Sequence, residues 1–407
     1  MRPLRHRDFR LLWIGQAVSF FGSMVTFVAI PYQAYQLSHS SLVVGLLGLA
    51  ELAPLLVTAL LGGALADTVD RRRLVQIAEA SLGIASALLL ANSLVPHPQL
   101  WVLFVLSAVI AGLTGLLRPP LDALLPRLVE QDELAAAGAL ASLRMQIGMI
   151  AGPAVGGVLI SAWGVAPTYG FDVVTFGLSL VALALMRAVP PPVDAEPVSL
   201  RAIAEGFRYA RSRPELLGTY GVDMVAMFFG MPMALFPAFA ARVGGPGGLG
   251  LLYAAPSVGS LLATLTSGWA SRVSRHGAAV CVAAAGWGAA VAALGFAPNL
   301  WLAVLALGAA GACDMISGIF RGVIWNQTIP DRLRGRLAGI EQISYSTGPL
   351  LGNVEAGVAA SLFGLRASIV SGGVLCVAGV GVAVALLPAF WRYDARMHAP
   401  EPEPAAA

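Results

Sequence analysis

The chain has 407 residues, of which 57% are apolar and 12% are charged, and its mean hydropathy is +0.78. Because soluble globular proteins carry roughly a quarter of their residues as charged side chains, this composition excludes a soluble enzyme or binding domain and indicates a protein surrounded by lipid. The net charge of +3 comes with no basic domain that could bind nucleic acid.

Twelve apolar runs follow one another along the chain. Each can cross a hydrocarbon core of about 30 Å as a helix, which takes about 20 residues. The first run is longer than the apolar part of a signal peptide, so we interpret it as a retained span. We predict an all-α membrane protein with twelve transmembrane helices, at about residues 11–36, 42–66, 74–94, 100–124, 135–163, 165–187, 215–242, 248–270, 278–297, 300–326, 337–363 and 366–390.

The arginines predict the orientation of these helices. With the N-terminus inside, 21 of the 25 arginines fall in internal segments and only Arg242 and Arg366 fall in external loops. This bias predicts that both termini lie in the cytoplasm, and we expect the membrane to be the bacterial inner membrane. The remaining two arginines, Arg144 and Arg321, lie within predicted spans.

The longest internal connection divides the chain into two halves. Residues 1–190 and 214–397 each contain six predicted spans, and residues 191–213 form a linker with an amphipathic helix expected from Ser199 to Arg213. Residues 398–407 are rich in Pro, Glu and Ala and are predicted to be disordered. Gly152-Pro153 and Gly348-Pro349 occupy similar places in the two halves, which suggests a duplicated six-helix unit.

Several motifs resemble those of the major facilitator superfamily. Gly63, Asp67, Arg71 and Arg72 look like its signature between spans two and three, and a glycine-rich stretch of span five looks like its antiporter motif. Within the superfamily, the sequence is most similar to the drug and siderophore exporter branch. Three stretches carry this likeness: Phe9 to Gln16, Gly250 to Ala255 followed by Thr266-Ser267-Gly268, and Ile329 to Arg336. The antiporter-like motif consists of Gly148, Gly152, Pro153, Gly156 and Gly157.

The resemblance implies a transporter with the twelve-helix fold, and it implies that Asp67 closes an inner gate against the start of span eleven. The sequence departs from the general signature at Thr68 and Asp70, and the latter acid is similar to the siderophore exporter branch. The superfamily's arginine early in span four is missing, because residues 102–112 hold no basic side chain. This absence argues against the usual proton relay.

Ionisable residues inside spans are the candidates for coupling transport to protons, because each costs at least about 2.5 kcal/mol at mid-bilayer unless it faces a cavity or a partner. Glu51, Asp223, Asp314 and Arg144 are the coupling candidates. An inter-helix ion pair is the alternative for each, and Arg321 could simply neutralise Asp314. For Glu79 and Glu341 we expect structural pairs, with Arg72, Arg73 or Arg336 as partners.

The other candidate residues have structural readings too. Gln16, Ser19, Met227 and Phe228 are candidates for the substrate cavity, although such residues often belong to the core. The glycines of span five give a smooth helix face, which packs closely on another helix and also allows the two halves to rock. Asp67 could be a helix cap instead of a gate.

We predict a secondary transporter that exports a small organic molecule, such as a siderophore, drug or secondary metabolite, by proton antiport. The sequence contains no phosphate-binding loop for ATP and no catalytic set, so we expect neither an enzyme nor a cofactor or metal. We expect a monomer that contacts lipid, its substrate and protons. An importer or facilitator on the same fold, and a non-transporting receptor, are the alternatives.

Overall fold

The computed structural model describes residues 2–68, 70–187, 207–394 and 396, and it describes no side chains for residues 60–68 or for most of residues 331–343. Within these ranges the chain is helical and contains no strand. Eleven described segments are long and apolar enough to cross a membrane, and helix α13 covers the remaining predicted run. The predicted fold class is confirmed. Most of the predicted linker and the predicted tail lie outside the described residues.

The N-terminal half is a bundle of six helices. Helix α1 packs against α5 and α6, α2 packs against α4, and α3 packs against α4 and α6. Their bounds are α1 (Arg7–Ser38), α2 (Ser41–Thr68), α3 (Arg71–Leu94), α4 (Leu100–Leu124), α5 (Leu134–Trp163) and α6 (Ala166–Ala184), with short 3₁₀ segments η1 (Pro3–Arg5), η2 (Leu125–Arg127) and η3 (Gln131–Glu133).

The C-terminal half repeats this arrangement. Helix α8 packs against α11, α13 and α14, α10 packs against α12, and α11 packs against α12 and α14. The bounds are α8 (Pro214–Phe229), η4 (Met233–Leu235), α9 (Phe236–Val243), α10 (Gly245–Leu265), η5 (Ser267–Arg272), α11 (His276–Leu294), α12 (Leu300–Thr328), α13 (Asp331–Phe363), α14 (Leu365–Leu386) and α15 (Pro388–Trp391).

The seventh span is broken, which its continuous apolar sequence does not reveal. Helix α8 ends at Phe229, and the chain continues through η4 into α9. Side chains from neighbouring helices satisfy the freed backbone groups: Trp287 donates to the Gly230 carbonyl at 2.9 Å, and Asn353 accepts from the Ala234 amide at 2.9 Å. Such a break is tolerated in a membrane only where protein groups replace the lost helical hydrogen bonds.

The fifth helix of each half, α5 and α13, and the turn that follows it show an internal repeat in which equivalent residues lie 200 positions apart in the sequence. Gly148 lies against Phe20 of α1, and Gly348 lies against Met227 of α8. The turn after each helix also repeats, since Gly164 and Gly364 have positive φ angles of 81° and 86°, a conformation that favours glycine. The structure therefore relates Gly148 to Gly348, whereas the sequence comparison had matched Gly152 with Gly348.

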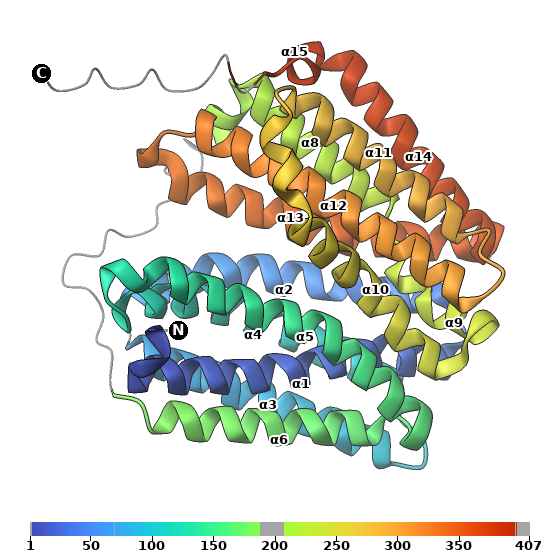
Figure 1. Cartoon of the computed structure of the whole chain (residues 1–407). Helices are drawn as coiled ribbons and strands as arrows, with labels where there is room; N and C mark the ends of the chain where they lie inside the picture. The colour runs from blue at the N-terminus through green and yellow to red at the C-terminus, as the bar shows by residue number, and fades with distance from the viewer. Residues whose placement is uncertain (1, 69, 188–206, 395, 397–407) are drawn as a thin grey trace, which may run out of the picture.

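The two halves touch mainly through α5 with α10 and through α2 with α13. A Cβ atom added to Gly157 would lie 2.7 Å from the Gly250 amide nitrogen, and one added to Gly48 would lie 2.8 Å from the Leu350 carbonyl oxygen. These contacts lie at the end of the molecule remote from the termini. In Figure 1 the two bundles are closest at that end and diverge toward the end that carries N and C.

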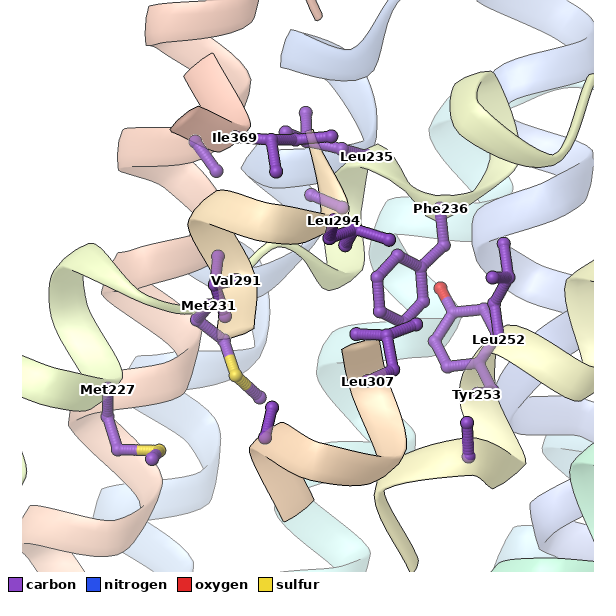
Figure 2. Close-up of a cluster of buried hydrophobic side chains, with 14 of the residues drawn as sticks. Met227, Met231, Leu235, Phe236, Leu252, Tyr253, Val291, Leu294, Leu307 and Ile369 are labelled. Atoms are coloured by element: carbon purple, nitrogen blue, oxygen red, sulfur yellow. The ribbon is translucent and has the colours of Figure 1, made fainter. Parts of the chain in front are cut away.

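A hydrophobic cluster fills the C-terminal half near the broken span and continues into the N-terminal half. Figure 2 shows Phe236 of α9 beside Tyr253 of α10, with ring centroids 5.0 Å apart. Tyr253 also meets Phe27 of α1 edge to face at 5.5 Å. This ring therefore links the cores of the two halves, and its hydroxyl donates to the Met233 carbonyl at 3.1 Å.

Candidate functional site

A polar network crosses the interior of the N-terminal half. Glu79 of α3 is 0% exposed, and its Oε1 accepts hydrogen bonds from Gln16 and Ser19 of α1, the latter at 3.0 Å. The amide oxygen of Gln16 accepts from Arg144 of α5 at 3.5 Å. The Arg144 guanidinium also lies 5.9 Å from the centre of the Phe20 ring. Gln16 thus links a buried carboxyl to an arginine on another helix.

A second buried carboxyl in the same half belongs to Asp172 of α6. Its Oδ2 accepts from Thr26 of α1 at 2.9 Å and from Ser86 of α3 at 2.7 Å, and Thr175 approaches Oδ1 at 3.5 Å. Hydroxyl donors from three helices therefore surround this group, which joins α1, α3 and α6. Buried polar groups held in this way position helices without needing a counter-charge.

An ion-pair cluster occupies the C-terminal half. Arg321 of α12 is 2% exposed and forms a salt bridge with Asp223 of α8, which is 7% exposed. Its other amino group lies 3.5 Å from Asp314, whose side chain is 42% exposed. Arg321 therefore pairs with two acids, not with Asp314 alone. Asp314 is thus the more exposed of the two acids.

Aromatic rings surround this cluster. The Arg321 guanidinium lies 5.3 Å from the centre of the Tyr345 ring of α13. Trp325 is 6.3 Å from Tyr345 and 5.7 Å from Tyr220 of α8, and it donates to Thr219 at 2.9 Å. Stacking and cation–π contacts of this kind fix the orientation of the guanidinium.

The structure gives Glu79 different partners from those that the sequence predicts. Glu79 contacts Gln16 and Ser19, while Arg72 donates to the carbonyls of Leu183 and Ala184 at the end of α6 at 2.8 Å. Glu341 interacts electrostatically with Arg321 and with Arg118 of α4, and the side chain of Arg336 lies outside the described residues. The expected pairing of Glu79 with Arg72 or Arg73 is wrong.

Glu51 lies on α2 and is partly exposed, and it interacts electrostatically with Tyr253 of α10. Its side chain forms no hydrogen bond or ion pair with the part of the chain that the structure describes. Glu51 thus lies near the boundary of the two halves, apart from both polar clusters.

The gate motif is only partly visible. Gly63 and Asp67 belong to helix α2, but their side chains are outside the described set. Arg71 donates to the Ala123 carbonyl at 3.2 Å. Arg71 and Arg72 thus place positive charge at the C-terminal ends of α4 and α6, where the helix dipole favours it.

The antiporter-like motif lies where α5 contacts two different helices. Gly148, Gly152 and Gly156 lie against α1, and Gly157 lies against Gly250 of α10. The carbonyl oxygen of Pro153 also faces Gly250. One helix face therefore packs within its own half, and the neighbouring face packs against the other half.

The predicted cavity residues are mostly buried. Gln16 and Ser19 belong to the network around Glu79, and Met227 packs against Gly348. Phe228 is partly exposed and meets Phe229 edge to face at 4.9 Å. Among the described residues, no group of three His, Cys, Asp or Glu side chains could hold a metal ion.

Sequence reasoning overlooked Asp172 and assigned Glu79 to an ion pair with an arginine. The signal for Asp172 was present, because it lies six residues after the start of α6, within an apolar run. Its hydroxyl donors come from helices far apart in the sequence, so only the packing shows that the carboxyl is enclosed.

The sequence matches the family described as transmembrane secretion effector over residues 1–407. The chain belongs to this family. It is accordingly a multi-pass membrane transporter of the major facilitator type, and its relatives are transporters, not enzymes.

Similar proteins carry the name enterobactin exporter. The protein of Citrobacter koseri is 29% identical over 383 residues, which cover 93% of this chain and 90% of that protein. The protein of Shigella boydii is 28% identical over 387 residues, which cover 94% and 92% of the two chains.

Solved structures of other transporters share the fold. A POT family transporter in complex with 5-aminolevulinic acid has a TM-score of 0.74 at 11% identity, covering 94% of this chain and 96% of that chain. A bacterial homologue of the lysosomal transporter Spinster, in an inward-facing and unoccupied conformation, has a TM-score of 0.71 at 16% identity and covers all of both chains.

Proposed function

We propose that this transporter exports a small organic molecule of the siderophore, drug or secondary-metabolite class from the bacterial cytoplasm, in exchange for protons. The observation that carries the proposal is the similarity to enterobactin exporters along more than 90% of the chain. Because the similarity includes both halves, it extends over the whole transport unit and not over a shared fragment.

The geometry supports alternating access. At the end remote from the termini, glycines of one half lie directly against backbone atoms of the other half. With both termini in the cytoplasm, as the arginine distribution indicates, this is a conformation closed to the outside. The glycines of α5 let α5 and α10 close tightly, and Asp67 with Gly63, Arg71 and Arg72 forms the gate at the opposite end.

The buried charges support a proton drive. Asp223 and Gln16 each lie nine residues after the first residue of their helices, α8 and α1, so polar clusters occupy the same depth in both halves. Asp223, Asp314, Arg144 and Glu51 are the candidates that respond to protons. One proton moving through 100 mV releases about 2.3 kcal/mol, enough to hold a gradient of about 40-fold at about 1.4 kcal/mol per tenfold.

Transport direction and drive are tested together in membrane vesicles. Everted vesicles, whose lumen corresponds to the outside of the cell, are loaded with acid, and enterobactin is supplied in the external medium. An exporter accumulates enterobactin in these vesicles, and a protonophore abolishes the accumulation. Accumulation in right-side-out vesicles instead would identify an importer, and accumulation insensitive to the protonophore would refute the proton drive.

Asp314→Asn is the test variant for the proton drive, and Asp394→Asn is its matched control. Asp314 contacts Arg321 inside the C-terminal half, whereas Asp394 follows the last short helix, outside the spans. We expect the first variant to reduce proton-driven accumulation and the second to leave it unchanged.

A further inference from the structure

The carboxyl of Glu79 is completely buried and only half satisfied. Oε1 accepts from Gln16 and Ser19, whereas Oε2 has no hydrogen-bond partner in the described part of the chain. The Ser179 hydroxyl of α6 is placed to donate a hydrogen bond to the carboxyl, but its Oγ lies outside hydrogen-bonding geometry with every described group. An unpaired carboxylate oxygen away from water is costly. A proton on Oε2 would remove the charge and turn this oxygen into a donor beside the Ser179 hydroxyl.

Asp172 provides the contrast within the same bundle. Both its oxygens are approached by hydroxyl groups, and no oxygen of this carboxyl is left without a partner in the described residues. Burial alone therefore does not distinguish the two acids. The distinction is that both oxygens of Asp172 have hydroxyl groups within hydrogen-bonding distance, whereas Oε2 of Glu79 faces only the Ser179 hydroxyl, which lies outside hydrogen-bonding geometry.

Gln16 connects Glu79 to the charge of Arg144. Its NH₂ group donates to Glu79, and its carbonyl oxygen accepts from Arg144. Arg144 is partly exposed and also interacts electrostatically with Asp122 of α4. Among the described residues, Arg144 is the charged group that acts on Glu79, while the neighbours from α1 and α6 are uncharged. The guanidinium thus lies between a buried acid and an exposed one.

We infer that Glu79 is a proton-carrying carboxyl of the N-terminal half and that Gln16 couples the charge state of Glu79 to the position of Arg144. Ionised Glu79 draws Arg144 toward Gln16. A proton that binds Oε2 neutralises the carboxyl and frees Arg144 to turn toward Asp122. When that proton leaves Oε2 as H⁺, the arrangement is restored. This inference rests on the proposed exchange of substrate for protons, and it adds a coupling site that does not include Glu51.

The first test detects the proton itself. Infrared difference spectra of the purified full-length protein are recorded over a series of pH values, because a protonated carboxyl has its own C=O band. We expect a band that changes with pH in the wild type, that is lost in Glu79→Gln and that remains in Asp172→Asn. Glu79→Gln keeps an oxygen that accepts from Gln16 and Ser19, and Glu79→Asp, which retains a carboxyl, keeps a titrating band if the glutamine variant does not fold. An unchanged band in a folded Glu79→Gln protein overturns the inference.

The second test separates coupling from binding. In the vesicle assay with enterobactin, Glu79→Gln should lose accumulation driven by the pH gradient but retain exchange of labelled for unlabelled enterobactin, which needs no net proton movement. Asp172→Asn should retain both. Proton-driven accumulation by Glu79→Gln equal to the wild type refutes the role of Glu79. If the wild type itself does not move enterobactin, the proposed substrate fails, while the infrared result still decides whether Glu79 carries a proton.

Discussion

The contact between Gly157 of α5 and Gly250 of α10 makes a quantitative prediction about gating. A Cβ atom at position 157 would lie 2.7 Å from the Gly250 nitrogen and 2.8 Å from its Cα. Ordinary contacts between carbon atoms lie at about 3.5–4.0 Å, so Gly157→Ala must separate the two helices by about 1 Å. Both obstructing atoms belong to backbone, and no side chain can rotate to relieve the clash.

Overpacking of this kind costs about 1–3 kcal/mol. The cost arises only in the conformation in which α5 and α10 touch, because each helix belongs to a different half. The population of that conformation should therefore fall about 5- to 150-fold relative to one in which these helices are apart. Gly138→Ala is the matched control, since Gly138 lies on the same helix and nothing lies within 4 Å of an added Cβ.

Spin labels report the change directly. Labels placed at Trp163, at the end of α5, and at Arg242, at the end of α9, give a distance distribution between the two halves. Labelling uses a background from which Cys281, Cys313 and Cys376 have been removed. We expect a longer distance to gain population in Gly157→Ala but not in Gly138→Ala. Identical distributions for the two variants would refute the argument that this contact holds the outer end closed.

Three further predictions concern the described helices. Arg321→Met should destabilise the protein by about 3–5 kcal/mol, because it leaves Asp223 as an unpaired buried charge. Thermal unfolding in detergent measures this loss of stability. The double variant that also carries Asp223→Leu should recover much of the lost stability. Asn353→Leu should cost about 1–3 kcal/mol in the same assay, because the Ala234 amide loses its acceptor, whereas an unchanged melting temperature would show that the broken span has another source of stability. A reporter fused after residue 396 should be active if it is one that works in the cytoplasm and inactive if it works only in the periplasm. Activity of a periplasmic reporter at this position would contradict the predicted topology.

The predicted spans came from the lengths of the apolar runs, and the predicted orientation came from the arginine distribution. Both are properties of the local sequence. A helix that crosses lipid must satisfy its own backbone hydrogen bonds, so the span count could be obtained without knowing any partner. The break at Gly230 escaped detection for the same reason. Its stability comes from Trp287 and Asn353, which lie 57 and 119 residues away from their partners in the chain.

The residues themselves determined which acids could occupy the interior, and only the tertiary structure decided how each one is held. The sequence suggested Glu51 as a coupling candidate and a structural ion pair for Glu79. Packing instead encloses Glu79 beside Gln16, surrounds Asp172 with hydroxyl groups and places Arg321 between Asp223 and Asp314. The energy of a buried charge depends on the donors and counter-charges within a few ångströms. In this protein those groups come from other helices, which only the fold brings together.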